Sequence, residues 1–238
     1  MLPCAILCGG LATRLRPVTD KIPKSLIPIQ GQPFLAYQLE LLRRNEIRDV
    51  VLCVGFLGEQ IEQFAGSGSA WGLNLTCSSD GGTPLGTAGA IRNAIGYLGE
   101  RFFVLYGDSY LDCDYRSIAA SFLHSGKRGM MTIYRNNGQF DRSNVEAEEG
   151  KILRYDKQNF SENMRYIDYG LGLFERSVFA GLARDRSTDL ATVYQSLLAA
   201  GELTAHEVKQ RFYEIGSREG IREFEQYLSQ TSSVTAEQ

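Results

Sequence analysis

Residues 4–24 read CAILCGGLATRLRPVTDKIPK, in which an apolar run ends in two glycines and leads into a basic loop. The run at 4–8 has the length and composition of a buried strand. Gly9 and Gly10 lack a Cβ atom, so the backbone can turn sharply there and approach a ligand closely. The side chains of the loop that suit phosphate, through hydroxyl donors or positive charge, are Thr13, Arg14, Arg16 and Lys24. This segment therefore predicts a phosphate-binding loop directly after a buried strand.

Two widespread phosphate-binding motifs are absent from this loop. The Walker P-loop requires G-x-x-x-x-G-K-[ST] and the dinucleotide fingerprint requires G-x-G-x-x-G, and neither spacing occurs here. The loop instead resembles the signature of the sugar-1-phosphate nucleotidyltransferases, G-G-x-[GA]-T-R-L followed shortly by P-K. The resemblance implies that Arg14 and Lys24 are catalytic. The nucleotide contacts that it implies in this region are Leu7, Gly9, Gly10, Thr13 and Arg14. A glycine-rich turn with a solvated basic face is the alternative.

Length and composition exclude several classes of protein. The 238 residues suit one large α/β domain or two small ones, and the hydrophobic content of 43% is ordinary for a globular chain. A net charge of −3 argues against a nucleic-acid partner. No apolar stretch approaches the roughly 18 residues that a membrane-spanning helix needs. We therefore expect neither nucleic acid nor a membrane as a partner.

The cysteines predict a compartment rather than a site. The chain has five cysteines, no C-x-x-C pair and two histidines, which argues against a zinc site. The odd number of cysteines and the lack of a signal-peptide pattern favour a reducing cytoplasm. Cys8 as a catalytic thiol is an alternative, but a cysteine that ends a buried strand usually acts as a small hydrophobic residue.

The first half of the chain alternates apolar runs with amphipathic helical patterns. Such alternation predicts a parallel sheet with helices on both faces. In the first helix, Leu35, Leu39 and Leu42 recur at helical spacing and form a buried face. The predicted strands are 4–8, 50–54, 73–78 and 102–106, and the predicted helices are 33–44, 57–65, 87–98 and 115–125.

The second half has a different pattern, with strands first and helices later. Its strands are predicted at 130–135, 152–155 and 166–174, its helices at 177–182, 190–200 and 218–228, and its loops at 135–144 and 159–165. We expect one α/β domain at 1–229, with a nucleotide-binding half at about 1–110 and a sugar-phosphate-binding half at about 111–229. Residues 230–238 lack an apolar period and are expected to be a disordered tail. The fold that the resemblance implies is a Rossmann-like, mixed and mostly parallel sheet flanked by helices, of the nucleotide-diphospho-sugar transferase type.

An aspartate follows the predicted strand that ends in Tyr106-Gly107-Asp108. Ligands bind beyond the carboxyl ends of strands in an open α/β sheet, and Mg²⁺ commonly takes one or two carboxylates plus substrate phosphates. The resemblance implies that Asp108 is a metal ligand. It also implies a second ligand in a late D-x-G motif, where this chain has Glu214, whose longer arm changes the geometry. Asp112 and Asp114 suit helix capping better.

The segment Leu85-Gly86-Thr87-Ala88-Gly89 resembles the L-G-T-A-G loop of the family. The resemblance implies that Gly86 contacts the base through its backbone and that Thr87 lies beside it, and Thr87 also suits the cap of the following helix. Asp80 is the candidate side chain for the base, because a carboxylate can accept from N1–H and the exocyclic amine of guanine. Asp80 as an ordinary turn residue is the alternative.

Three further segments resemble sugar-binding motifs of the family. Asp156-Lys157 stands in place of an E-K pair, which implies that Lys157 binds the phosphate of the sugar phosphate and Asp156 a sugar hydroxyl. Asp168 stands in place of the asparagine of N-A-G and could accept from two hydroxyls. Asp141–Glu146 resembles the R-Y-G-N-V-E segment of the heptose-1-phosphate guanylyltransferase branch. The expected sugar-phosphate site is Lys157, Asp156, Asn144, Asp168 and Gly107. Without the family, each charged member is an ordinary residue near a strand.

The resemblance implies an enzyme with Mg²⁺ as cofactor, which converts a nucleoside triphosphate and a sugar 1-phosphate into a nucleotide sugar and pyrophosphate. GTP with D-glycero-α-D-manno-heptose 1-phosphate is the favoured pair, and uridylyl, thymidylyl or cytidylyl transfer to another sugar 1-phosphate is the alternative. Glu214 also leaves open a non-catalytic sensor of nucleotide or sugar phosphate. A glycosyltransferase would use a D-x-D motif such as Asp112-Cys113-Asp114, but the loop at 9–24 would then have no role. The aromatic residues of the second half favour a homodimer, although the sequence leaves the oligomeric state open.

Overall fold

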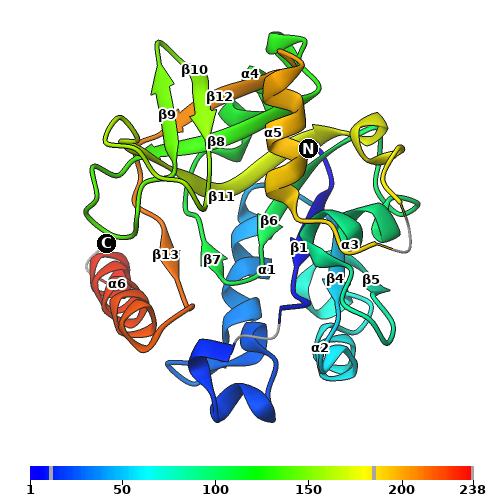
Figure 1. The fold of residues 1–238 in the computed structure, drawn as a ribbon. Coiled ribbons are helices and arrows are strands. Elements are labelled where there is room, and N and C mark those ends of the chain that lie inside the picture. Colours follow the sequence, from blue (N-terminus) through cyan, green and yellow to red (C-terminus); the bar gives the residue numbers. More distant parts are fainter. Residues whose placement is uncertain (11–12, 184–185, 237–238) are drawn as a thin grey trace.

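The computed structural model describes residues 1–10, 13–183 and 186–236, which form a central mixed sheet flanked by helices (Figure 1). Four strands of the first half are parallel neighbours in the order β6-β1-β4-β5. They are β1 (Cys4–Leu7), β4 (Asp49–Val54), β5 (Asn74–Ser79) and β6 (Arg101–Tyr106). Their carboxyl ends meet at one edge of the sheet, so the residues that follow them are brought together.

The second half of the chain adds antiparallel pairs to the same sheet. The strand β11 (Tyr166–Glu175) pairs antiparallel with β6 on one side and with β8 (Gly129–Arg135) on the other. The hairpin of β9 (Val145–Glu148) and β10 (Lys151–Tyr155) joins at β11, and β12 (Leu203–Val208) pairs parallel with β8. The prediction of a mixed sheet flanked by helices is confirmed, and β11 is the strand that unites its two parts.

Each face of the sheet has its own hydrophobic core, because successive residues of a strand point to opposite faces. Ile6 lies in one core and Ala5 in the other. The helices α1 (Phe34–Arg44), α2 (Gly58–Ala65) and α4 (Tyr115–Ser125) contribute to the first core. The second core is covered by α3 (Gly86–Ala94) and α5 (Leu190–Ala199). The expected apolar face of the first helix is confirmed, since Leu35, Leu39 and Leu42 are all buried.

The last helix, α6 (Arg218–Ala236), extends into the segment 230–238, in which a disordered tail was expected. Its first turns are anchored by Phe224, whose ring packs against Phe34 and Tyr37. Once such a packed turn exists, each further residue adds one backbone hydrogen bond, so a helix can continue through a segment without an apolar period. No helix in the described part of the chain is long and apolar enough to cross a membrane.

Short elements complete the structure, and most of them were not predicted. The two-residue strands are β2 (Pro28–Ile29), β3 (Gln32–Pro33), β7 (Ser109–Tyr110) and β13 (Tyr213–Glu214). The 3-10 turns are η1 (Thr13–Leu15), η2 (Val18–Asp20), η3 (Lys24–Leu26), η4 (Ser69–Trp71) and η5 (Arg176–Phe179). The turn η5 lies where a helix was expected at 177–182. The pairing of β13 with β7 carries Glu214 to the functional edge of the sheet.

Candidate functional site

A cavity of about 310 Å³ opens at the carboxyl ends of the parallel strands. It brings together the two-glycine turn, Lys24 and the segment at Gly107 and Asp108, although these are far apart in the sequence. The predicted site residues that line it are Leu7, Gly9, Gly10, Lys24, Asp80, Gly86, Thr87, Gly107 and Asp108. Cys8, Ser25, Cys53, Pro84, Ala90 and Tyr106 also line it. Of these, only Cys8 was weighed from the sequence, because the others occur in apolar runs or turns that carry no motif.

Glycines let the strand ends crowd together around this cavity. A Cβ atom on Gly107 would lie 2.3 Å from the carbonyl oxygen of Leu7, and one on Gly55 would lie 3.0 Å from the carbonyl oxygen of Gly9. A Cβ atom on Gly10 would meet no described atom within 4 Å. Gly107 is therefore required for packing and Gly55 is tightly packed, whereas Gly10 keeps the cavity free of a side chain.

Lys24 and Asp108 form the closest charged contact in the cavity. Lys24 begins the turn η3, and its Nζ lies 2.5 Å from Oδ2 of Asp108. Both side chains are partly shielded from solvent, with 18% and 32% of their surfaces exposed. The ammonium group of Lys24 thus lies directly beside the carboxylate of Asp108, which was expected to bind metal. Lys24 and a metal ion would therefore compete for the same oxygen.

Glu214 reaches the same region through the β7–β13 ladder. Glu214 pairs with Ser109, and the N–H of Ile215 donates to the carbonyl of Asp108 at 2.9 Å. The side chain keeps an exposed surface, but protein atoms crowd around its carboxylate. This desolvation, followed by the negative charge of Asp108, raises the pKa of Glu214 to about 7. The two carboxylates therefore share one electrostatic environment.

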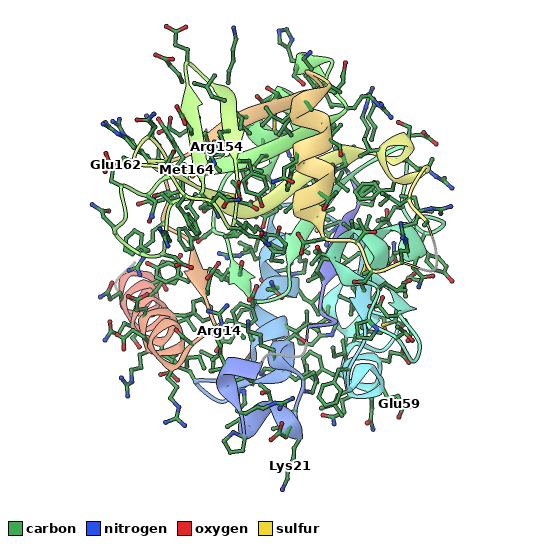
Figure 2. All side chains as sticks on the ribbon, viewed as in Figure 1. Arg14, Lys21, Glu59, Arg154, Glu162 and Met164 are labelled. Atoms are coloured by element: carbon green, nitrogen blue, oxygen red, sulfur yellow. The ribbon has the colours of Figure 1, made fainter. Side chains whose placement is uncertain are left out.

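A second cavity of about 280 Å³ adjoins the first and is lined by Arg14, Asp108 and Glu214. Asp108 lines both cavities, so they lie on two sides of the same carboxylate. Arg14 is exposed on the amino-terminal segment beside α6 (Figure 2). No salt bridge joins Arg14 to a carboxylate of the described residues, so its guanidinium is available to an anion. The side chain of Thr13 lies outside the described residues.

The donor set suits a hard divalent ion. Asp108 and Glu214 offer carboxylate oxygens, which Mg²⁺ prefers over nitrogen and sulfur ligands. The described residues contain no group of three or more histidine, cysteine or acidic side chains that could hold a metal alone. Because Mg²⁺ usually keeps waters and takes substrate phosphates as ligands, two carboxylates are a sufficient protein contribution.

Asp80 follows β5 and is half-buried in the cavity wall. Its Oδ2 accepts a long hydrogen bond of 3.4 Å from the N–H of Leu85. Its Oδ1 is buried and has no hydrogen-bond partner among the described residues. Burial raises the pKa of Asp80, and the N–H of Leu85 opposes that shift. A buried carboxylate oxygen without a donor is costly, so this position suits a ligand that donates hydrogen bonds.

The loop at Gly86 and Thr87 fixes the opposite wall. Gly86 has φ of +73°, and a Cβ atom there would lie 2.6 Å from the carbonyl oxygen of Thr188. Only glycine fits this position. Thr87 is the second residue of α3 and does not cap that helix. Its hydroxyl instead accepts from the N–H of Leu190, the first residue of α5, at 2.7 Å.

Of the expected sugar-binding residues, Gly107 lines the first cavity, whereas Lys157 and Asp168 line neither cavity and form a side-chain cluster with Tyr106 and Tyr155. Lys157 Nζ lies 3.5 Å from the hydroxyl of Tyr106, and that hydroxyl donates to Oδ2 of Asp168 at 3.4 Å. The hydroxyl of Tyr155 donates to the same oxygen at 3.2 Å, and the N–H of Gly170 donates to Oδ1 at 3.1 Å. Three protein donors therefore use Asp168, and roughly one of its four acceptor positions remains for a ligand.

Asp156 and Asn144 are engaged locally. Asp156 accepts from the N–H groups of Gln158 and Asn159, at 2.8 and 2.9 Å, which is the pattern of a turn. The side-chain oxygen of Asn144 accepts from the N–H of Asp168 at 2.9 Å and holds that residue in place. Neither residue lines the two cavities. Their visible contacts are therefore structural.

The remaining aspartates and Cys8 have other contacts. Asp114 caps α4 as expected, because its side chain accepts from the N–H of Ser117 at 2.9 Å. Asp112 instead accepts from the hydroxyl of Tyr227 at 2.8 Å. Cys8 lines the cavity, but burial raises the pKa of its thiol to about 12. A thiol with such a pKa is a poor nucleophile at neutral pH.

Comparison with known proteins finds a match to one protein family across nearly the whole chain. The model of the family described as Nucleotidyl transferase matches residues 4–230. D-glycero-alpha-D-manno-heptose 1-phosphate guanylyltransferase from Campylobacter jejuni is 29% identical over 179 residues, which cover 75% of this chain and 78% of that relative. UTP--glucose-1-phosphate uridylyltransferase from Synechocystis sp. is 30% identical over 203 residues. That match covers 78% of this chain and 52% of the longer relative.

A solved structure has the same fold. The crystal structure of HddC from Yersinia pseudotuberculosis complexed with GMP-PN matches with a TM-score of 0.76 and 23% identity. The match covers 94% of this chain and 97% of that chain. The two curated relatives act on different nucleotides and different sugars by name, so similarity alone leaves the base and the sugar unresolved.

Proposed function

Because this chain belongs to the nucleotidyl transferase family, we propose that it transfers the guanylyl group of GTP to a sugar 1-phosphate, D-glycero-α-D-manno-heptose 1-phosphate being the favoured acceptor. The products are GDP-heptose and pyrophosphate. The homologues of the chain are sugar-1-phosphate nucleotidyltransferases, and the choice of base and sugar is the new part of the proposal.

The unpartnered carboxylate oxygen of Asp80 carries the choice of guanine. A carboxylate presents two acceptors side by side, and guanine alone among the common bases offers two adjacent donors on its Watson–Crick edge, N1–H and the exocyclic amine. Uracil and thymine offer one N–H between two carbonyl oxygens, which would face the carboxylate with repulsion. Guanine would supply the donor that Oδ1 of the half-buried Asp80 lacks and a second donor to Oδ2, whose bond from Leu85 is long.

The reaction needs positioning and charge stabilisation more than proton transfer. A phosphate oxygen of the sugar 1-phosphate attacks the α-phosphorus of GTP in line, and the bond from that phosphorus to the bridging oxygen of pyrophosphate breaks. Because the nucleophile is already anionic, no general base is required. The protein must instead offset the repulsion between two polyanions.

The cationic side chains of this chain suit that task. Arg14 would bind the triphosphate and stabilise the charge that develops on pyrophosphate, because its guanidinium matches phosphate oxygens. Lys24 would leave Asp108 and bridge the α-phosphate and the incoming phosphate. Lys157 would hold the phosphate of the acceptor. Asp108 and Glu214 would hold Mg²⁺, which neutralises phosphate charge when it is bound.

A uridylyltransferase is the second candidate, and the similarity to the Synechocystis relative favours it. The two candidates differ in the base expected beside Asp80, which is guanine for a guanylyltransferase and uracil for a uridylyltransferase. In the sensor alternative, Glu214 would mark a chain that binds substrates without turnover.

Pyrophosphate release separates these functions. The purified chain is incubated with Mg²⁺ and one of GTP, UTP, CTP, dTTP or ATP, against D-glycero-α-D-manno-heptose 1-phosphate, α-D-mannose 1-phosphate and α-D-glucose 1-phosphate. Release with GTP and the heptose phosphate supports the proposal. Release with UTP instead would assign a uridylyltransferase. Binding of GTP by calorimetry without any release would favour the sensor.

A further inference from the structure

The side chain of Tyr106 lies between the two candidate subsites. It ends β6 at the centre of the sheet, and it lines the cavity beside Gly107 and Asp108. The amide of the buried Gln38 donates to the backbone carbonyls of Tyr106 and Ser109, at 3.0 and 2.8 Å, and fixes the chain at this point. The backbone that carries the phenol is therefore held rigidly.

A bulge in β11 makes room for the ring. The register between β11 and β8 shifts between Asp168 and Gly172, and Gly170 has φ of +95°. A Cβ atom on Gly170 would lie 3.2 Å from Cδ2 of Tyr106. The bulge and the glycine thus bring β11 against the ring of Tyr106, whose hydroxyl donates to Asp168.

The hydroxyl of Tyr106 connects a cation to an anion. Lys157 Nζ donates to it at 3.5 Å, and it donates onward to Asp168 Oδ2 at 3.4 Å. No salt bridge joins Lys157 directly to Asp168 in the part of the chain that the structure describes. A phenol hydroxyl can accept one hydrogen bond while it donates another, so the Tyr106 hydroxyl can accept from Lys157 and donate its proton to Asp168.

Lys157 has little else to hold it. Its side chain is exposed, and its Nζ lies 5.3 Å from the ring centroid of Tyr106 and 5.9 Å from that of Tyr155. An exposed lysine samples many rotamers, and the contacts with Tyr106 restrict them before any phosphate arrives. Without the hydroxyl, the ammonium would move to Asp168 or into solvent.

We propose that Tyr106 is a positioning residue that holds Lys157 for the phosphate of the acceptor sugar and thereby joins the nucleotide cavity to the sugar-phosphate subsite. This inference rests on the proposed function. It implies that the hydroxyl of Tyr106 affects acceptor binding through Lys157, whereas the ring of Tyr106 is the part that lines the nucleotide cavity.

Steady-state kinetics of four variants test this role. Tyr106→Phe keeps the ring and removes the hydroxyl, and Lys157→Ala removes the amine. The double variant tests whether the two act together, and Tyr37→Phe is the matched control, since its hydroxyl donates to the carbonyl of Ile29 outside the cluster. Pyrophosphate release is measured at saturating GTP with D-glycero-α-D-manno-heptose 1-phosphate, or with α-D-mannose 1-phosphate if only that acceptor is used.

Loss of one hydrogen bond predicts that Tyr106→Phe raises KM for the acceptor by about tenfold. KM for GTP stays within about twofold, because the ring is retained. In the Lys157→Ala background, adding Tyr106→Phe has no further effect, since the hydroxyl then has no amine to position. Tyr37→Phe keeps the wild-type kinetics, and thermal melts show a cooperative unfolding transition for all four variants.

Two results would overturn the inference and are distinguishable. If wild-type protein turns over but Tyr106→Phe leaves the acceptor KM unchanged, or adds its full effect to Lys157→Ala, Tyr106 does not act through Lys157. If wild-type protein releases no pyrophosphate with either acceptor, the proposed function is wrong and this role falls with it.

Discussion

The two candidate subsites are built in different ways. The nucleotide side is formed mainly by backbone, because glycines at 9, 55, 86 and 107 let strand ends and a helix start approach one another closely. The sugar side is formed by side chains from β6, β10, β11 and the turn after β10, which are linked by the hydroxyls of Tyr106 and Tyr155. A backbone site keeps its shape through the sheet, whereas a side-chain cluster depends on each member.

This difference explains how one fold can keep its chemistry and vary its acceptor. Changes in the backbone site require changes in glycine positions and strand packing. Changes in the cluster require only side-chain replacements on strands that remain paired. The variants below test the two regions separately, from the largest expected effect to the smallest.

Removal of the cations that face phosphate should have the largest effect. Arg14→Ala and Lys24→Ala should each lower kcat by about 10²–10³, the usual loss when a preorganised charge in the transition state is removed. Pyrophosphate release under saturating substrates measures the effect. Arg16→Ala is the matched control, because Arg16 is exposed and pairs with Asp20 at 3.1 Å. Near-normal kcat in both variants with unchanged melts would contradict the roles given to Arg14 and Lys24.

Asp80→Asn should change the base preference. The asparagine amide has one acceptor oxygen and one NH₂ donor, whereas the carboxylate has two acceptor oxygens. The NH₂ group would therefore face a donor of guanine and repel it. We expect kcat/KM for GTP to fall by about 10- to 100-fold, with a smaller loss for UTP. Asp49→Asn, at the other end of the neighbouring strand, is the control. An equal loss for both nucleotides would indicate that Asp80 supports the fold and does not read the base.

Gly107→Ala should destabilise the protein more than Gly10→Ala. The added methyl group would lie 2.3 Å from the carbonyl oxygen of Leu7 in the first variant and in open space in the second. Overpacking of this kind costs about 1–3 kcal/mol in the free energy of unfolding. Urea denaturation of the two variants compares them directly. Equal stability would show that the strand ends can separate, and the nucleotide site would then be less rigid than described.

Asp156→Ala should have the smallest effect on catalysis. Its carboxylate closes the turn at Gln158 and Asn159, so the free energy of unfolding should fall by about 1 kcal/mol. The acceptor KM should change by less than about threefold, unlike in Lys157→Ala, because the turn bonds already use both carboxylate oxygens. A tenfold rise in that KM without loss of stability would make Asp156 a sugar ligand.

The backbone side could be predicted from the sequence because its signals are local. The apolar run at 4–8, the two glycines and the aspartate after 102–106 lie next to one another or at the ends of periodic segments. Pairing of the parallel strands then brings them together without further information.

The side-chain cluster could be predicted only in part. Lys157 and Asp168 were expected near the acceptor, but Tyr106 and Tyr155 occur in apolar runs, where a tyrosine normally indicates core packing. The strand β12 was missed because its buried residues depend on pairing with β8, which is distant in the sequence. Likewise, the two-residue strand β13 exists only through its contact with β7.

Identification of the nucleotide sugar formed in competition tests the central claim most directly. The wild-type chain is incubated with Mg²⁺, equal concentrations of GTP, UTP, CTP, dTTP and ATP, and D-glycero-α-D-manno-heptose 1-phosphate together with α-D-mannose 1-phosphate. Mass spectrometry of the products then reports relative kcat/KM for every pair at once. We predict a GDP-sugar as the dominant product, with heptose as its sugar. A UDP-sugar as the dominant product would contradict the account. A reaction that forms neither pyrophosphate nor any nucleotide sugar would also contradict it.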